Sequence, residues 1–193
     1  MYRCLIANRG EIAVRIIRAC REMGIETVAI YAKGDEDSLH VGLADQAICI
    51  GEANPLDSYL NIPRIIGAAE VSGANAIHPG YGFLSESTSF AEAVEDNNIH
   101  FIGPNKTTME MMGDKITARQ TVDGAGVPVI PGSTDEVKSV EEIEELAKDI
   151  GFPVVLKAAS GGGGKGIRIV KEPEQLAKAF KEAKSEGQKY FND

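Results

Sequence analysis

The sequence is short of basic side chains. Its 193 residues contain 20 Lys and Arg against 29 Asp and Glu, which gives a formal net charge of −9. Nucleic-acid binding depends mainly on clustered Lys and Arg, so nucleic acid is not expected as the main partner. Seven carboxylates fall within residues 135–149 and are expected on the solvated face of a helix.

Long apolar runs and paired cysteines are also lacking. No apolar stretch approaches the length of a membrane span, and the first residues enter a strand pattern rather than a signal peptide. Cys4, Cys20 and Cys49 are odd in number and lie in apolar patterns, so we expect small core residues and neither a disulfide set nor a metal site. A soluble protein of the reducing cytoplasm, without membrane contact, is predicted.

Two nucleotide-binding fingerprints are absent. The first turn has only Gly10 where a dinucleotide-binding fold needs G-x-G-x-x-G, so an NAD-dependent oxidoreductase has little support. A P-loop needs Ser or Thr after its Gly-Lys and then a helix. Lys165 is followed instead by Gly166, and then by the strand pattern 167–170.

The first part of the chain alternates between strand and helix patterns. Short connections join them, which predicts an α/β fold with a Rossmann-like parallel sheet covered by helices on both faces. The expected strands are residues 3–7, 27–31, 46–50, 76–78 and 100–102. The helix after Gly10 is expected to bury Ile12, Ile16 and Met23 on one side.

A different pattern follows. We predict a domain at 1–112, a helical connector at 113–130, with Asp114 as a helix cap, and an incomplete α+β lid at 131–193. A short strand is expected at 127–130. In the lid, Ser139 and Glu142 form a capping box for a helix that is expected to bury Val140, Ile143, Leu146, Ala147 and Ile150. Two strands and a helix from Pro173 complete the lid.

Four consecutive glycines lie between those two strands, within the stretch 157–166. Each ordered glycine costs roughly 0.5–1 kcal/mol relative to alanine, and a backbone without Cβ atoms can close its N–H groups around a phosphate. Lys157 is a lone charge at the end of an apolar strand, which is costly on a strand packed on both faces and favours a ligand role. A mobile hairpin tip, with Lys157 extended along an exposed face, is the alternative.

Four motifs stand out in the sequence: Ile6 to Ala13 (IANRGEIA), His78 to Glu86 (HPGYGFLSE), Phe101 to Pro104 with Met112 to Lys115 (FIGP, MGDK), and Lys157 to Gly166 (KAASGGGGKG). In this order and spacing they closely resemble biotin carboxylase, a family of the ATP-grasp superfamily. The resemblance extends over nearly the whole chain. It implies that ATP and Mg²⁺ activate bicarbonate, by way of carboxyphosphate, and that CO₂ is transferred to N1 of biotin on a carrier protein.

The resemblance also implies ATP-binding residues. Lys115 and Lys157 match the two ATP-contacting lysines of this region, and Gly163 and Gly164 match loop glycines that meet the nucleotide. Lys165 stands where some relatives have arginine. The lid that closes over ATP would exclude water.

Other polar residues have weaker claims. His78 and Glu86 follow the end of the fourth strand, where ligands bind in open α/β sheets, although a structural histidine is the simpler interpretation of His78. Asn8 and Arg9 could line the same edge or fix a loop. His40 and His100 have less support still.

Relatives continue well beyond Asp193, and the resemblance places the catalytic residues, the Mg²⁺ carboxylates and the bicarbonate and biotin sites there. The 193-residue chain is therefore expected to be inactive alone, although its parent would be the biotin carboxylase component of acetyl-CoA carboxylase, acting in fatty acid synthesis with a biotin carboxyl carrier protein and a carboxyltransferase. A carboxylase of pyruvate, propionyl-CoA or urea is an alternative. A non-catalytic module is another; family members often dimerise, and the helix surface near Arg18 and Glu22 is a candidate contact.

Overall fold

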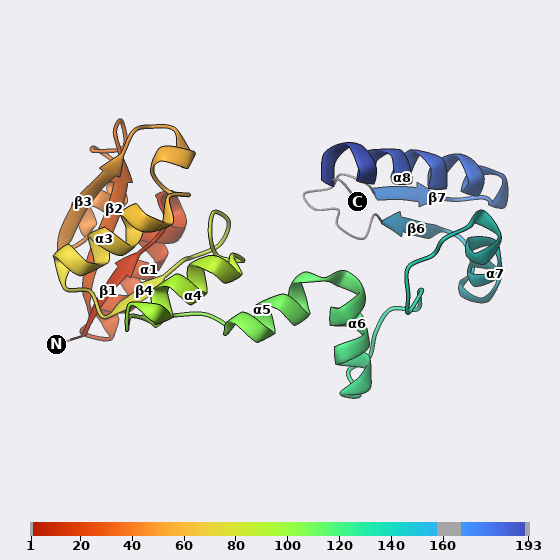
Figure 1. Ribbon diagram of the computed structural model, residues 1–193, viewed down its shortest axis with the longest axis horizontal. Coiled ribbons are helices and arrows are strands. Elements are labelled where there is room, and N and C mark those ends of the chain that lie inside the picture. Colours follow the sequence, from red (N-terminus) through yellow and green to blue (C-terminus); the bar gives the residue numbers. More distant parts are fainter. Residues whose placement is uncertain (1, 158–166, 192–193) are drawn as a thin grey trace. The chain divides into compact units, whose positions relative to one another are not determined.

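The computed structural model describes residues 2–157 and 167–191. The chain forms two compact units, Met1–Glu110 and Met111–Asp193, each with a fold of its own (Figure 1). The three-part division at residues 112 and 130 remains a prediction.

A five-stranded parallel sheet organises the first unit. Its order is β3-β2-β1-β4-β5, and every neighbouring pair is parallel. The strands are β1 (Arg3–Ile6), β2 (Glu26–Ala32), β3 (Gln46–Gly51), β4 (Ala76–His78) and β5 (His100–Phe101). The predicted fold class is confirmed for this unit. The order of the strands reverses between β1 and β4, which are therefore neighbours at the switch point of the sheet.

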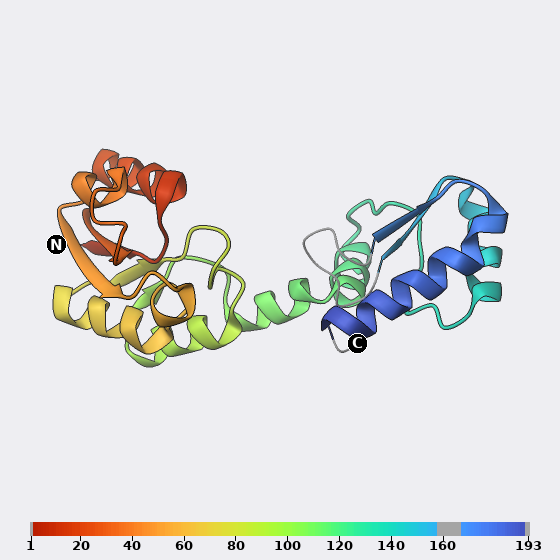
Figure 2. The same cartoon turned by 90° about the horizontal axis from the view of Figure 1, so that it is seen from above.

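Helices cover both faces of this sheet (Figure 2). α1 (Gly10–Glu22) and α2 (Leu39–Leu43) lie on one face, and α3 (Ile62–Ser72) and α4 (Thr88–Asp96) on the other. The alternation of β1 accounts for this arrangement, because successive side chains point to opposite faces. Ile6 packs with Ile17 of α1, whereas Leu5 lies in the cluster that contains Ile65 of α3 and Phe90 of α4.

Three details of the first unit differ from expectation. Cys49 is exposed and is not a core residue, because it lies on β3, an edge strand of the sheet. Met23 is exposed rather than buried, because α1 ends at Glu22 and Met23 is already its C-cap. The short helix α2 and the 3-10 turn η1 (Pro55–Asp57) were not predicted, since segments of five and three residues are too short to show a helical period.

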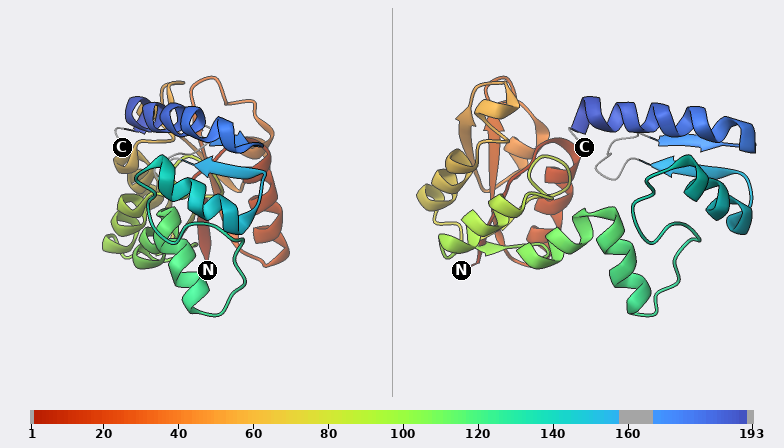
Figure 3. Two further views of the ribbon diagram at one scale, coloured as in Figure 1. Left: turned by 90° about the vertical axis from the view of Figure 1, so that its right-hand side faces the viewer. Right: turned by 45° about the vertical axis from the view of Figure 1, so that its right-hand side comes forward.

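The second unit is built on an antiparallel hairpin of β6 (Val154–Lys157) and β7 (Ile167–Val170). Its helices are α6 (Lys115–Gly124), α7 (Val140–Ile150) and α8 (Leu176–Phe191), the last preceded by the 3-10 turn η2 (Pro173–Gln175); α5 (Lys106–Gly113) runs across the boundary of the two units. Figure 3 shows α8 lying along the hairpin. The buried core joins Val154 and Val170 of the hairpin to Ile143 of α7 and Leu176 of α8.

The strand expected at 127–130 is wrong. These residues form no ladder in the described part of the chain, and Ile130 is exposed. Pro128 within the segment and Pro131 just after it lack the N–H groups that a ladder requires, which explains the outcome.

Helix α7 follows its prediction with two corrections. Ser139 Oγ accepts the N–H of Glu142 at 3.3 Å, but the Glu142 carboxylate accepts the N–H of Lys138 rather than that of Ser139, at 2.9 Å. Ile143 and Ala147 are buried, Val140 and Leu146 are only half-buried, and Ile150 in the last turn is exposed, which corrects the place of the last three in the predicted core. The seven carboxylates of residues 135–149 are exposed, as predicted.

Candidate functional site

The hairpin of the second unit has one covered and one open face. Val154 and Val170 point into the core, so the alternate residues must point away from it. Val155 pairs with Ile169, and Lys157 pairs with Ile167. The three apolar side chains are 49% (Val155), 39% (Ile167) and 65% (Ile169) exposed, and Lys157 is exposed beside them. This open face therefore combines one cation with an apolar strip.

The argument that placed Lys157 on a strand packed on both faces is wrong for the described residues. The hairpin has only two strands, and its helices cover a single face. No described carboxylate forms an ion pair with Lys157. By contrast, Arg168 on the covered face pairs with Glu182 at 3.3 Å and with Glu186 of α8. Lys157 is thus placed to meet a ligand on the open face without any penalty of burial.

Lys115 is the first residue of α6. Asp114 caps this helix as predicted, with its Oδ1 accepting the N–H of Thr117 at 2.7 Å, and this bond lowers the pKa of the Asp114 carboxyl. A lysine at a helix N-terminus adds its charge to the positive end of the helix dipole. The Asp114 carboxylate at the same helix end offsets part of this positive potential.

The remaining predicted nucleotide-binding residues, Gly163 and Gly164, lie outside the described residues, as does Lys165.

The carboxyl edge of the first unit's sheet carries a second group of polar residues. Asn8, which follows β1, is buried, and its Nδ2 donates to the carbonyl oxygens of Pro79 at 2.7 Å and Tyr81 at 2.8 Å. His78 Nδ1 accepts the N–H of Gly80 at 3.0 Å, and burial lowers the pKa of this histidine. Both side chains make the contacts expected of loop-fixing residues.

Arg9 lies in an aromatic and acidic setting at the same edge. Its guanidinium carbon is 5.2 Å from the ring centroid of Tyr59 and 5.7 Å from that of Phe83. Arg9 Nη1 is 3.2 Å from Asp35 Oδ2, and the Tyr59 hydroxyl donates to the same Asp35 oxygen at 2.7 Å. Asp35, Tyr59 and Phe83 were not singled out from the sequence. The position of Asp35, soon after the end of β2, was the signal that could have identified it.

The other sequence candidates lie apart from these contacts. Glu86 is exposed on the loop before α4, and His100 is exposed on β5. His40 is buried, with Nε2 3.2 Å from the carbonyl oxygen of Ile30.

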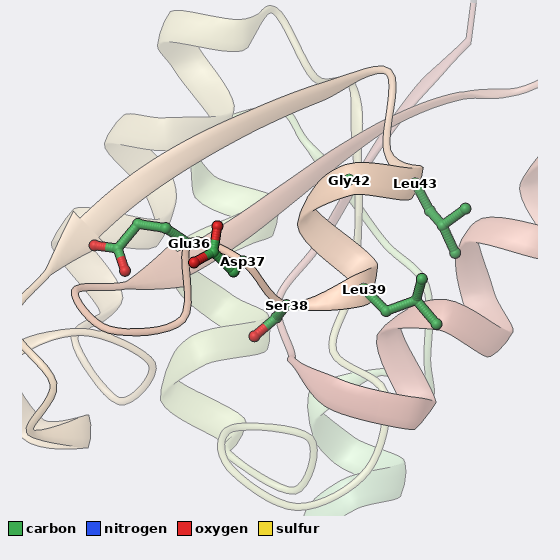
Figure 4. A pocket seen from close by; sticks show the side chains of 6 residues that line it. All are labelled: Glu36, Asp37, Ser38, Leu39, Gly42 and Leu43. Carbon is green, nitrogen blue, oxygen red and sulfur yellow. The ribbon is translucent and has the colours of Figure 1, made fainter.

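A shallow hollow of about 400 Å³ lies beside α2. Figure 4 shows Glu36 and Asp37 at one end of it and Leu39 and Leu43 at the other. It is lined by one continuous segment and contains none of the predicted site residues. Within residues 2–157 and 167–191, no group of three or more His, Cys, Asp or Glu side chains is placed to hold a metal ion. No helix in the same residues has the length and apolar character of a membrane span.

Comparison with known proteins decides the family. Residues 1–109 match the family model described as biotin carboxylase, N-terminal domain, and residues 114–193 match the one described as carbamoyl-phosphate synthase L chain, ATP binding domain. The chain belongs to the biotin carboxylase family. The two matches meet near the division between the two compact units.

Curated members of the biotin carboxylase family are similar throughout. Biotin carboxylase of Nostoc sp. is 54% identical over 189 residues, which cover 98% of this chain and 42% of that protein. The 2-oxoglutarate carboxylase small subunit of Hydrogenobacter thermophilus is 52% identical over 97% of this chain and 39% of its own length. The chain thus spans about two fifths of the length of these relatives.

Solved biotin carboxylase structures share the fold. The complex of Campylobacter jejuni biotin carboxylase with β-γ-ATP has a TM-score of 0.88 at 51% identity, over 99% of this chain and 43% of that one. A second structure is the biotin carboxylase domain dimer of the H. thermophilus 2-oxoglutarate carboxylase, in complex with MgADP, ADP and bicarbonate. It has a TM-score of 0.84 at 51% identity, over 98% of this chain and 42% of that one.

Proposed function

We propose that the chain forms the N-terminal α/β domain and part of the ATP-grasp lid of an enzyme that carboxylates biotin on a carrier protein, using ATP and bicarbonate. The open face of the β6–β7 hairpin carries this proposal. A nucleotide presents an apolar base at one end and anionic phosphates at the other. Lys157 beside Val155, Ile167 and Ile169 has the matching arrangement of charge and apolar surface.

We propose the phosphates as the ligand of both lysines. Lys157 meets them from the hairpin and Lys115 from the N-terminus of α6, where the helix dipole adds to the attraction. We also propose Gly163 and Gly164 as residues that meet the nucleotide, since a backbone without Cβ atoms can approach a phosphate. A lysine binds phosphate as a compact point charge, so its contribution depends on charge more than on side-chain geometry.

Bound ATP supplies the phosphoryl group that activates bicarbonate. The residues of this chain hold the phosphates and, in a closing lid, exclude water from the reacting groups. The chain spans about two fifths of the length of its relatives, and we propose that the Mg²⁺ ligands, the catalytic residues and the bicarbonate and biotin sites belong to the part of the enzyme beyond Asp193.

We further propose that the parent protein is the biotin carboxylase component of acetyl-CoA carboxylase, a cytoplasmic homodimer that works with a biotin carboxyl carrier protein and a carboxyltransferase. Relatives named simply biotin carboxylase support this assignment. A 2-oxoglutarate or pyruvate carboxylase is the second candidate, since one relative of each kind is 52–54% identical. Carboxylation assays of the complete complex with each acceptor distinguish them. Chloroplastic relatives make cell fractionation the test of location.

ATP cleavage that depends on both bicarbonate and biotin tests the central proposal. The full-length protein is expected to show it, and the 193-residue chain alone is not. In the full-length protein, Lys157→Ala should raise the KM for ATP by about tenfold or more, because a charge-assisted contact contributes about 1.5–3 kcal/mol.

Lys171→Ala is the matched control, since Lys171 is equally exposed just after β7 but lies beyond the residues of the open face. Its ATP KM should stay at the wild-type value. Equal effects of the two substitutions would exclude the assigned role of Lys157, and turnover by the 193-residue chain would overturn its predicted inactivity.

A further inference from the structure

The loop between β4 and α4, residues 79–87, lies at the switch point of the parallel sheet. β1 and β4 pair here, with Ile6 opposite His78, and both strands end at the carboxyl edge of the sheet. Open α/β sheets bind their ligands at this position. Tyr81, near the centre of the loop, is exposed.

Asn8 uses both of its N–H donors to hold this loop. Its two Nδ2 hydrogens go to the carbonyl oxygens of Pro79 and Tyr81, and its Oδ1 accepts the N–H of Arg9 at 2.9 Å. Gly80, between the two carbonyls, has φ +66°, and a Cβ there would lie 2.9 Å from Asn8 Nδ2. The side chain is buried and satisfied, so the loop backbone is fixed at two points.

Arg9 holds the next part of the same loop. The Phe83 ring stacks on the Tyr59 ring with centroids 5.1 Å apart and planes at 10°, and the Arg9 guanidinium lies against both rings. Phe83 itself has φ +41°, which is unusual for a residue other than glycine. Such a conformation costs about 1–3 kcal/mol and persists only where its surroundings determine it. Here the surroundings are Arg9 and Tyr59, and Asp35 holds both of them.

The geometry points to Asn8 and Arg9 as positioning residues that keep the loop 79–87 in one shape for the carboxylation of biotin. This inference rests on the proposed function. The proposed nucleotide-binding residues all belong to the second unit, whereas this loop belongs to the first. Because the loop contains none of the proposed nucleotide-binding residues, we expect it to affect the carboxylation step rather than the affinity for ATP.

Arg9→Lys in the full-length protein tests the inference, because it keeps the charge and removes the planar group that lies on the rings. We expect amide hydrogen exchange of residues 79–87 to become about tenfold faster. We also expect kcat to fall by about 10–100-fold, since small misplacements at a reacting site have effects of this size. The KM for ATP and the melting temperature should remain near the wild-type values.

Arg15→Lys is the matched control, because it makes the same substitution at an exposed position of α1 and should leave loop exchange and kcat unchanged. Phe83→Leu is a second variant that removes one ring, and it should reproduce the effects of Arg9→Lys. Wild-type exchange and kcat in both variants would overturn the inference, as would losses that only follow the melting temperature. If the wild-type protein shows no biotin-dependent ATP cleavage, the proposed function fails; the exchange data still decide whether Arg9 fixes the loop.

Discussion

His40 is a buried histidine with one ring nitrogen unused. Nε2 lies 3.2 Å from the carbonyl oxygen of Ile30, which makes it the protonated nitrogen, and Nδ1 has no hydrogen-bond partner among the described residues. Burial lowers the pKa of His40 and outweighs the hydrogen bond to Ile30 and the charge of Asp35, which raise it, while Arg9 lowers it to a lesser extent. The folded protein therefore favours the neutral ring.

This preference predicts a pH dependence of stability. An unfolded histidine titrates near pH 6.5 and binds a proton more readily than folded His40, so the contribution of the neutral ring is complete above about pH 6.5 and is lost as the pH falls through the lower folded pKa. As the pH falls from 8 to 5, the free energy of unfolding measured in urea should decrease less in His40→Gln than in the wild type. Parallel curves for the two proteins would contradict the prediction. His78, whose pKa is also lowered by burial, is present in both proteins and cancels in the comparison.

At the residue scale, the sequence indicated which residues lie at the edge of the sheet better than it indicated which side chains they contact. Asn8 and His78 were correctly considered as loop-fixing residues, because a polar residue at the end of an apolar strand has few other roles. The partners of Arg9 could not be predicted, since Tyr59 and Phe83 are distant in the sequence and meet only when the sheet forms. The unpaired Nδ1 of His40 also depends on tertiary packing.

At the element scale, the hairpin was predicted but its exposed face was not. β-branched residues occupy both sides of β6 and β7, so alternation of polarity gave no indication of which side is covered. Only the contacts with α7 and α8 decide this. The short η1 turn was missed for a related reason, since no period can be seen in three residues.

Substitution by alanine is expected to have opposite effects on stability at two glycines, Gly51 of β3 and Gly67 of α3. Gly51 at the end of β3 has φ +144°, and a Cβ there would overlap the backbone oxygen of Asp57 and the guanidinium of Arg64. Gly51→Ala should therefore lower the unfolding free energy by more than about 2 kcal/mol. Gly67 lies within α3 with open space around it, so Gly67→Ala should raise the unfolding free energy by about 0.5–1 kcal/mol.

Chemical denaturation of the two glycine variants provides the measurement, and each serves as the control for the other. A Gly51→Ala protein as stable as the wild type would show that the turn after β3 adapts to a side chain.

At the scale of the whole molecule, each unit has its own core. The first unit buries two clusters, one on each face of its sheet, whereas the second buries a single cluster around Val154 and Val170. The change of sequence pattern after residue 112 predicted this organisation, because strands and helices alternate before it and not after it. The division near Glu110 falls inside α5, which no local pattern could reveal.

Separate cores predict separate unfolding of the 193-residue chain. The second unit should open at lower denaturant concentration, because it buries less apolar surface. Leu176→Ala should lower the stability of that unit alone, by about 2–5 kcal/mol or enough to unfold it, and Ile65→Ala should act on the first unit alone. Hydrogen exchange as a function of urea measures both units in one experiment. A single shared transition, shifted equally by both substitutions, would refute the prediction.

The two hydrogen bonds from Asn8 Nδ2 also restrict the length of the chain between His78 and Tyr81. An amide has only two hydrogens, and they reach carbonyl groups two residues apart. Adding or removing one residue there would leave a buried donor unsatisfied or move Gly80, the residue with positive φ, out of register. Insertions should therefore be tolerated in the connection after β2, where the exposed residues 36–37 precede α2, and not in this one.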